Sequence, residues 1–553
     1  MKSNKQNIQS NHPWLETVAE GASERKRPLN MHRLHKWAGL VAALWIFVLG
    51  ITGFLIDHRG EWRWLWQFTV PEYLVSQKVL EKSIDGAIQI YRIDPESQNN
   101  HLAGGRRGLW RSNDAGESWI ETFFAGLDGD FPQVISVVED STEGWGKLWL
   151  ATDDGIWVAK DRGRTAERIA LEGDLITSLA VGSKPGELFG VISRSDVFRL
   201  DVSNPAERVS ISLSGLKEEQ LPESFALSRF IRDLHYGRGL FTGISSLLIN
   251  DVGGVAMAVL SLTGFFFWWM PRKWKKRVGT QTRKDHRNMK STMRLLFHSH
   301  STVFGVLAVI PIIYLALTGI IIDHNEELGP WLKKVNVNRS WLPPVYDMKS
   351  WDDEIYSLAG YPGEAGKFSL GTRGGLFTTT DGGNSWIKEN LPGPAAVFVW
   401  TLRRIGEGLY TGGMGSPNYM KLPEEKWAKV KGAGHMPSDM MVLSDGRIGW
   451  KGHGGIKVPT AEGDSEVIPI QLPVLTGVPI FYMLDGLHSG LIFHEQWKWV
   501  NDFVSILGLI LVVTGFVRWW RYARSRYFKF LAGFRSEPEI NAVILNDEPV
   551  HER

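Results

Sequence analysis

Four apolar stretches long enough to cross a bilayer constrain this chain more than any other feature. A helix needs about 20 apolar residues to span a hydrocarbon core of about 30 Å. The stretches cover residues 37–56, 252–270, 302–322 and 499–520. Their flanks are basic or rich in tryptophan, which favours membrane helices over the buried helices of a soluble core. We therefore predict four transmembrane helices, with a kink at Pro311 and with Arg518 reaching the interface.

Lysine and arginine gather on one side of these stretches. They cluster before the first, between the second and third, and after the fourth. Cytoplasmic loops of membrane proteins carry the excess of Lys and Arg. We therefore predict a multi-pass protein of the bacterial inner (cytoplasmic) membrane, embedded in membrane lipid. Both termini are predicted to be cytoplasmic, and the two large domains periplasmic. The predicted boundaries are tail 1–31, helix 32–58, external segment 59–245, helix 246–271, basic loop 272–297, helix 298–324, external segment 325–497, helix 498–521 and tail 522–553.

The chain is an internal duplication, because four motifs recur in the same order in its two halves. They pair ITGFLIDH (51–58) with LTGIIIDH (317–324), GLWRSNDAGESW (108–119) with GLFTTTDGGNSW (375–386), LHYG (234–237) with LHSG (487–490), and LTGFFFWW (262–269) with VTGFVRWW (513–520). Each half is therefore predicted to be a span, an external segment and a second span. Halves of equal topology are related by a pseudo-twofold axis along the membrane normal.

The external segments have the pattern of β-structure, with short strands and Gly/Asp turns that repeat about every 35–45 residues. The repeating units lie near 88–122, 134–170, 176–210, 354–390, 397–430 and 438–470. Three units in each half predict one six-bladed, propeller-like domain formed by both halves. The predicted fold class is an α+β membrane protein with four transmembrane helices in two duplicated halves and an all-β external domain.

Two of the repeated segments carry a specific turn signature. Residues 112–119 (SNDAGESW) match the pattern S-x-D-x-G-x-S-W, and residues 379–386 (TTDGGNSW) match it with Thr in the first position. The Asp side chain folds back onto turn amides, and the Gly supplies an unusual dihedral. These segments resemble the Asp boxes of sialidase-like propellers, and we interpret them as structural.

Composition excludes several classes of function. The chain has no Cys, which rules out disulfides, thiolate metal sites, iron–sulfur clusters and C-x-x-C-H haem attachment. A net charge of +2 argues against a nucleic-acid partner. No G-x-G-x-x-G motif, Walker A loop or flavin domain is recognisable. Any electrons must therefore come from a separate cytoplasmic donor or from membrane quinol.

Histidines at the ends of the spans are the chemical signal. His32, His35, His298 and His300 lie at the cytoplasmic end, and His58, His324, His235 and His488 lie at the external end. Neutral imidazole is the usual axial ligand of haem iron when Cys is absent. The 23 residues from His35 to His58 span about 35 Å of helix, so ligands lie at both faces.

Each predicted span also contains the dipeptide Thr-Gly. It occurs at 52–53, 263–264, 318–319 and 514–515. Glycine permits the close approach of another helix or of a flat ring. The dipeptide therefore serves either plain helix packing or a cofactor in the bundle.

These residues resemble the PepSY-associated transmembrane-helix family. The resemblance rests on LHKWAG (34–39) leading to Thr-Gly, on LHYG (234–237) and LTGFFFWW (262–269), and on their repeats at 487–490 and 513–520. It implies an inner-membrane reductase with two b-type haems, and some members act on ferric siderophores. His35 and His235 match family histidines, and His488 matches as the repeat of His235. No PepSY domain is recognisable in the external segments.

Symmetry and depth predict how the histidines pair. The cytoplasmic haem b is expected between His35 and either His300 or His298, because His300 precedes Gly305 by five positions instead of four. The external haem b is expected between His235 and His488. The remaining external histidines, His58 and His324, are a rival ligand pair or residues that orient the ligands. His32 belongs to the same cytoplasmic cluster.

The sequence thus predicts a haem-dependent oxidoreductase: a di-haem transmembrane electron-transfer protein that reduces a periplasmic acceptor, such as a ferric siderophore or other ferric chelate. One alternative is a membrane-anchored propeller that senses or binds a ligand without redox activity. Another is a metal or solute transporter, although Asp57, Asp323 and Asp502 all lie at the external ends of the spans.

Overall fold

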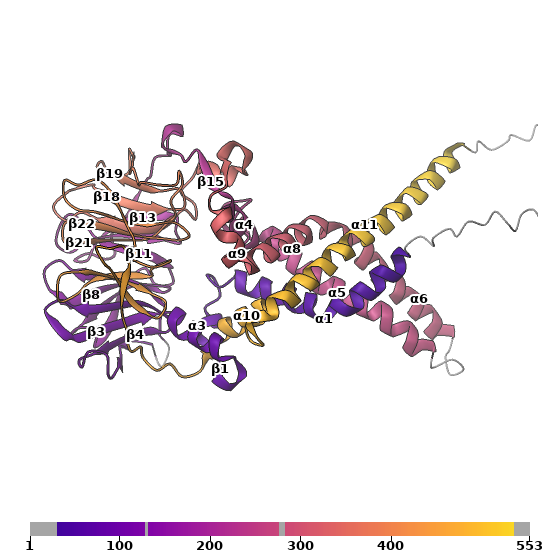
Figure 1. Ribbon diagram of the computed structural model, residues 1–553, viewed down its shortest axis with the longest axis horizontal. Helices are drawn as coiled ribbons and strands as arrows, with labels where there is room; N and C mark the ends of the chain where they lie inside the picture. Colours follow the sequence, from indigo (N-terminus) through magenta and orange to yellow (C-terminus); the bar gives the residue numbers. More distant parts are fainter. Residues whose placement is uncertain (1–29, 128–130, 276–282, 536–553) are drawn as a thin grey trace, which may run out of the picture.

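A ring of β-sheets stands at one end of the molecule and a bundle of long helices at the other (Figure 1). The computed structural model describes residues 30–127, 131–275 and 283–535. Most of the predicted tails 1–31 and 522–553, and the middle of the predicted loop 272–297, lie outside the described residues.

The first half of the chain supplies three antiparallel sheets to the ring. They are β2–β5 (Ile88–Asp94, Ser97–Gly105, Gly108–Ser112, Ile120–Glu121), β7–β10 (Val134–Asp140, Gly144–Thr152, Gly155–Lys160, Thr165–Ala170) and β11–β14 (Ile176–Val181, Glu187–Ile192, Asp196–Asp201, Arg208–Ile211). A fifth strand, β6 (Phe123–Phe124), joins the second sheet by parallel pairing with β10.

The second half supplies three more four-stranded sheets. They are β17–β20 (Ile355–Gly360, Phe368–Thr372, Leu376–Thr379, Ile387–Lys388), β21–β24 (Val399–Ile405, Gly408–Gly413, Asn418–Lys421, Ala428–Val430) and β25–β28 (Asp439–Val442, Ile448–Gly452, Gly455–Pro459, Ser465–Ile468). All six sheets begin and end close to the repeating units expected from the sequence. The prediction of three sheets from each half agrees with the structure.

The six sheets close into a propeller-like ring. The first strand of each sheet contacts the first strand of the next, and β2 meets β25 where the ring closes. Buried apolar side chains fill the spaces between sheets, as Phe189, Phe368 and Trp386 do between the third and fourth. Near the ring axis Arg92 Nε lies 3.0 Å from Asp439 Oδ2, and Arg403 Nη2 lies 2.8 Å from Glu139 Oε1. These ion pairs join first strands from both halves.

The two Asp boxes form the tight turns expected. The Asp114 carboxylate accepts hydrogen bonds from the Ser118 amide at 2.9 Å and the Ser112 hydroxyl at 2.6 Å. The Asp381 carboxylate accepts the same kinds of bonds in the other half. Gly116 has φ +89°, which a side chain would strain.

Two short sheets tie each half to the other between the ring and the bundle. β1 (Thr69–Val70) pairs antiparallel with β29 (Val478–Pro479), and β15 (Ser224–Ala226) pairs with β16 (Asn336–Asn338). In each pair one strand follows a span of its own half and the other ends the β region of the opposite half. The duplication therefore folds as one unit.

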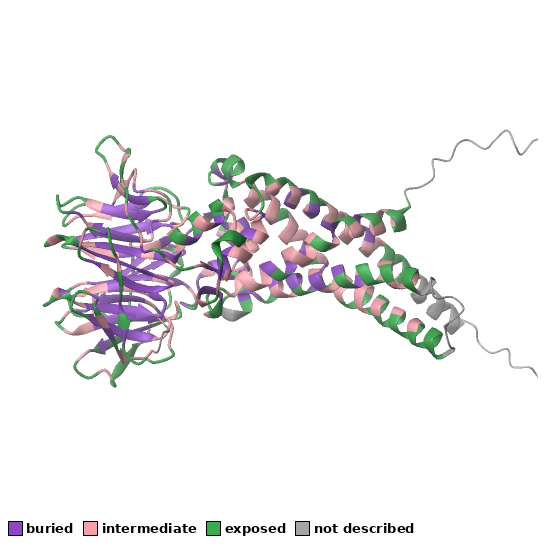
Figure 2. Cartoon of the chain, turned by 90° about the horizontal axis from the view of Figure 1, so that it is seen from below, coloured by how far each residue is buried: buried purple, intermediate pink, exposed green. Residues whose placement is uncertain are grey.

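The bundle holds the predicted spans. α1 (Met31–Asp57), α5 (Leu248–Lys275), α8 (Val309–Asp323) and α11 (Lys498–Arg535) contact one another in a closed four-helix arrangement. Among the described residues, three helices are long and apolar enough to cross a membrane, and a bent pair makes a fourth. Buried residues concentrate in the ring, while the bundle exposes apolar side chains such as Leu44 and Ile310 (Figure 2). Such a surface suits lipid.

The third span is not one straight helix. It begins with α6 (Arg283–His298), passes through the π-helical turn η4 (Ser299–Phe304) and the short α7 (Gly305–Leu307), and bends by 60° before α8. The predicted kink at Pro311 is confirmed, because proline near the start of α8 lacks the N–H that would continue the helix. The predicted loop 272–297 is largely helical, since α5 runs on to Lys275 and α6 begins at Arg283.

The expectation of an all-β external part is wrong. The segments between ring and spans contain α2 (Trp64–Gln67), α3 (Gln77–Ala87), α4 (Leu227–His235), α9 (Asn325–Leu332) and α10 (Ile480–Ser489). The physical reason is that the chain must pass from a wide ring to a narrow bundle, and short helices such as α4 and α10 make this passage by packing on the spans α8 and α1. Local signals support them, as in α3, where the Ser76 side chain caps the N-terminus by accepting from the Val79 amide.

Candidate functional site

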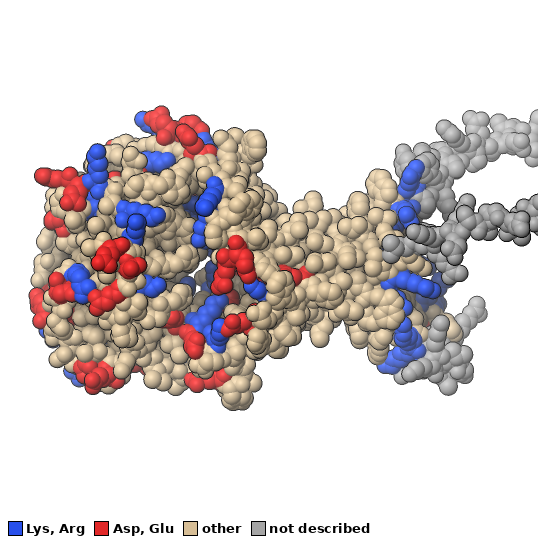
Figure 3. Space-filling view, in the orientation of Figure 1, with Lys and Arg blue, Asp and Glu red and all other residues tan. Residues whose placement is uncertain are grey.

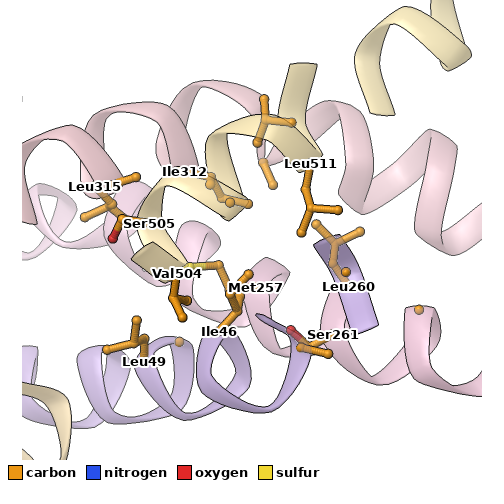
Figure 4. Close-up of a pocket in the computed structure, with 18 of the residues that line it drawn as sticks. Ile46, Leu49, Met257, Leu260, Ser261, Ile312, Leu315, Val504, Ser505 and Leu511 are labelled. Atoms are coloured by element: carbon orange, nitrogen blue, oxygen red, sulfur yellow. The ribbon is translucent and has the colours of Figure 1, made fainter. Parts of the chain in front are cut away.

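A cavity of about 1290 Å³ runs through the bundle. Its middle is lined by aliphatic side chains from α1, α5, α8 and α11, among them Ile46, Met257, Ile312 and Leu511 (Figure 4). Ordinary ligand pockets measure roughly 300–1,000 Å³, so this space admits more than one small group. Five histidines line it: His32 at one end, and a set of four, His35, His235, His300 and His488.

These four histidines form two facing pairs. The ring centres of His35, on α1, and His300, in η4, lie 6.3 Å apart. The ring centres of His235, at the end of α4, and His488, near the end of α10, lie 6.4 Å apart. Each pair takes one imidazole from each half of the chain, as the pseudo-twofold axis requires.

Each imidazole is held by the threonine of one Thr-Gly dipeptide. The Nδ1 to Oγ1 distances are 2.8 Å for His35–Thr514, 2.7 Å for His300–Thr263, 3.0 Å for His235–Thr318 and 2.9 Å for His488–Thr52. All four threonines are therefore paired with histidines, and no dipeptide serves helix packing alone.

The same threonines fix which ring nitrogen carries the proton. Thr52, Thr263, Thr318 and Thr514 each donate their hydroxyl hydrogen to the carbonyl four residues earlier, at 2.6–2.7 Å. A hydroxyl has one hydrogen, so its oxygen must accept from the imidazole Nδ1–H. The opposite nitrogen, Nε2, is then unprotonated and keeps its lone pair, which is the state a metal needs.

The glycines of the dipeptides give the imidazoles their space. A Cβ on Gly53 would lie 3.2 Å from His488 Cε1, and one on Gly319 would lie 3.3 Å from His235 Cε1. The equivalent distances are 3.5 Å at Gly264 and 3.4 Å at Gly515. The flat ring that approaches these glycines is the imidazole itself.

The structure places His300, and not His298, opposite His35. Seventeen positions separate His35 from Thr52, but eighteen separate His300 from Thr318. The π-helical turn η4 absorbs the extra residue, because its hydrogen bonds close five residues apart instead of four. His298 is exposed and does not line the cavity, whereas His32 lines its cytoplasmic end.

The rival external histidines do not face each other. His58 Nε2 lies 3.3 Å from Asp251 Oδ1, and His324 Nε2 lies 2.8 Å from Asp502 Oδ2. Each contact ties one span to the next within the same half-bundle, α1 to α5 and α8 to α11. Neither histidine lines the cavity.

Two asparagines that sequence reasoning missed hold the external pair in place. Asn250 Nδ2 donates to the His235 carbonyl at 2.7 Å, and Asn501 Nδ2 donates to the His488 carbonyl at 3.4 Å and to the Ser489 carbonyl at 3.2 Å. Both asparagines are about 95% buried. The sequence does contain a signal for them, because the dipeptide Asn-Asp occurs thirteen residues before Thr-Gly in both halves, at Thr263 and at Thr514.

The helix that carries His235 is docked to the ring by buried charges. Arg229 of α4 donates to the Arg373 carbonyl, and the Tyr346 hydroxyl donates to Asp233 of α4 at 3.0 Å. The Arg373 guanidinium in turn bonds Glu354 at the start of β17, with Nε 3.1 Å from Oε2. These charged side chains are each less than 9% exposed.

The helix that carries His488 is docked mainly by aromatic packing. The Phe481 and Trp66 rings are stacked with their centres 4.4 Å apart. Tyr482 packs edge-on against the same Trp66, and Lys82 of α3 binds Asp485 at 2.6 Å. The two halves therefore reach the same histidine geometry with different supports.

An apolar helical bundle with four paired histidines, joined to a ring of sheets, defines a membrane protein whose candidate chemistry lies between its helices. The chain belongs to the PepSY-associated TM region family, which matches residues 201–522. No curated protein matches the sequence significantly.

Solved structures similar to this chain are β proteins of propeller type. An ancestral GH74 enzyme is 12% identical, with 69% of this chain and 38% of that chain covered and a TM-score of 0.33. YCF48 bound to D1 peptide is 10% identical, with 65% and 72% covered and a TM-score of 0.29. The computationally designed Ika8 protein is 9% identical, with 72% and 94% covered and a TM-score of 0.32. The chain thus spans less than half the length of the GH74 enzyme.

Proposed function

We propose that this protein is a di-haem transmembrane electron-transfer protein, a haem-dependent oxidoreductase that reduces a ferric siderophore or other ferric chelate outside the membrane. The observation that carries the proposal is the pair of facing imidazole pairs in one cavity. In both pairs the threonine contacts assign the proton to Nδ1, which leaves the lone pair on Nε2. Family membership is consistent with this assignment.

The spacing of the imidazoles fits a group with two axial ligands. Two metal–imidazole bonds of about 2.0–2.1 Å, extended to the ring centres, require the centres to lie about 6.4 Å apart. The measured distances are 6.3 Å and 6.4 Å. His35 and His300 would hold one haem b, and His235 and His488 the other. When bound, a haem with two imidazole ligands supplies a one-electron couple without an open coordination position.

The threonine contacts support the ligand role further. They fix each imidazole in one orientation and one tautomer before any metal binds, and such outer partners raise ligand affinity. The asparagines Asn250 and Asn501 add a second restraint on the external pair, through the backbone of the ligand helices.

The two pairs lie at different depths of the bundle. His35 and Thr52, which holds His488, are separated by 17 residues of α1, or about 25 Å of helix. The start of α1, the ends of α5 and α11 and the start of α6 share the end away from the ring (Figure 1). That end is basic, so we assign it to the cytoplasm and the ring to the periplasm of a bacterial inner membrane.

Electrons would enter at His35 and His300 from a cytoplasmic donor or from quinol, and would leave at His235 and His488. One electron reduces one chelated Fe(III) to Fe(II). The test mixes the dithionite-reduced, purified protein anaerobically with an Fe(III) chelate and a coloured Fe(II) trap. Haem reoxidation with one Fe(II) formed per electron is expected. Protein without a haem spectrum, or reduced haem that does not reoxidise, would contradict the proposal.

A further inference from the structure

The face of the ring that meets the bundle is rich in arginine. The turns between the second and third strands of each sheet all lie at this face, because they stand beside the starts of the first strands. Arg106 occupies this turn in the β2–β5 sheet, and Arg194 occupies it in the β11–β14 sheet. Two more arginines approach from the bundle side, Arg59 just after α1 and Arg238 just after α4.

Among the described residues, few carboxylates lie at ion-pair distance from these four arginines. Arg194 and Arg238 share Asp353, at 3.2 Å and 2.8 Å. Arg106 lies over the Trp66 ring at 4.5 Å and donates to Gln133, and its Nε has no hydrogen-bond partner. Within the described part of the chain, neither Arg59 nor Arg106 has a carboxylate at ion-pair distance.

The arginines remain charged and close to one another. Burial, with the like charges of Arg59 and Arg194 nearby, lowers the pKa of Arg106 to about 10. It is therefore cationic at neutral pH although its surroundings disfavour the charge. An anion bound between these guanidiniums would relieve that cost, and arginine binds carboxylates through two parallel hydrogen bonds.

The cluster stands at the external end of the histidine cavity. The Arg59 guanidinium lies 5.9 Å from the Tyr236 ring centre, and Tyr236 directly follows His235 and lines the cavity. The surface is hollowed where the ring meets the bundle, with charged side chains around the opening (Figure 3). Arg194 and Arg238 each keep 26% of their side chains exposed, so a solute can reach them.

We propose that Arg59, Arg106, Arg194 and Arg238 form a binding site for the carboxylate groups of an anionic iron chelate. The claim that the bound chelate accepts electrons rests on the proposed function. The claim that an anion binds between these arginines does not. The site would favour chelates of net negative charge over neutral or cationic ones. An anion held there would lie beside the His235 and His488 pair.

The test measures binding of gallium(III) citrate, a redox-inert probe, to the full-length protein by calorimetry at low ionic strength. Arg59 is exposed, so R59Q can be expected to leave the fold intact. We expect about tenfold weaker binding or more in R59Q and R106Q, and partial recovery in R59K. Arg447, in the turn between β25 and β26, is paired with Asp445 of the same turn and with Glu466 of β28. It provides the control R447Q, which should bind normally.

Unchanged affinity in both variants, or absence of binding to the wild type, would overturn the anion site. Loss of haem in R59Q or R106Q, with gallium citrate binding retained, would assign the arginines to the haem carboxylates and overturn it too. Arginine-dependent binding by a protein without haem would sustain the anion site while the proposed function failed.

Discussion

The two histidine pairs use the same threonine and glycine contacts but are built on different supports. The cytoplasmic ligands, His35 and His300, belong to the spans themselves, far from the ring. The external ligands, His235 and His488, sit on short helices outside the spans. The helix of His235 is docked to the ring, and the helix of His488 packs on Trp66 of α2. The comparison teaches that the bundle alone can set the cytoplasmic pair, whereas the external pair also depends on the ring.

The largest effect is expected from removing an imidazole. H235A or H488A should lose one of two haems and keep the other, and H35A or H300A should lose the complementary one, because an axial ligand is gone. The haem content and reduced spectrum of each purified variant measure this outcome. Full haem content in all four variants would show that these histidines are not the haem ligands.

The histidines outside the facing pairs provide matched controls. H58A and H298A should keep both haems, since neither side chain lines the cavity. If H58A lost a haem while H235A and H488A kept both, the rival external pair would be correct and the assignment of α4 and α10 wrong.

A smaller effect should distinguish the supports of the two pairs. R373M leaves Glu354 buried without its partner, which costs about 3–5 kcal/mol for a buried ion pair. Because α4 bonds the Arg373 carbonyl and packs on this network, the external haem should be released at lower temperature, while the cytoplasmic haem should keep its release temperature. Thermal release followed at each haem band measures this. Equal shifts at both haems would show that the ring supports the bundle as a whole.

A weaker and more even effect is expected from the threonines. T318V and T514V keep the side-chain volume but remove the hydroxyl that fixes Nδ1, at the external and cytoplasmic pairs respectively. Loss of such an outer partner weakens metal affinity about 10–100-fold. Competitive haem transfer to an apo-protein acceptor measures the affinity. Unchanged affinity in both variants would mean that the hydrogen bonds do not orient the ligands.

The smallest effect concerns the ring alone and its Asp boxes. Hydrogen bonds from Ser112 and Ser118 lower the pKa of Asp114 to about 2, and those from Ser385 and Thr379 lower the pKa of Asp381 to about 2. A carboxyl with a depressed folded pKa contributes stability above its unfolded pKa of about 3.9, and that stability is lost as pH falls toward 2.

The double variant D114N/D381N should therefore lose less stability than the wild type between pH 4 and pH 2. Ring unfolding measured by circular dichroism across this interval tests the expectation. E462Q, which changes an exposed residue in the turn after β27, should behave as the wild type does. Parallel pH curves for wild type and D114N/D381N would refute a role for the boxes in acid stability.

Local patterns in the sequence predicted much of the fold. Apolar length, repeated motifs and turn spacing predicted the helical bundle and three sheets from each half, because each depends on neighbours in the chain. The external helices and the β1–β29 and β15–β16 pairings were missed, since the paired strands lie more than one hundred residues apart and follow no period. The choice between His300 and His298 could not be settled from spacing, because a π-helical turn changes the count of residues.

The candidate site was predicted only in part, because its contacts also join residues that are far apart in the chain. Symmetry indicated the His235 and His488 pair, but it could not show that each Thr-Gly dipeptide belongs to a particular histidine in another element. The asparagine contacts to the ligand helices are likewise tertiary. Only the positions of Asn250 and Asn501, thirteen residues before Thr-Gly, carried a signal in the chain itself.

The haem content and spin state of the purified protein test the central claim most directly. Pyridine haemochrome analysis should give two b-type haems per chain, and electron paramagnetic resonance of the oxidised protein should show two low-spin signals, as two imidazole ligands at each iron require. H35A should remove one of these signals and H235A the other. A protein purified with haem available that contained none, or that showed only high-spin iron, would contradict the account.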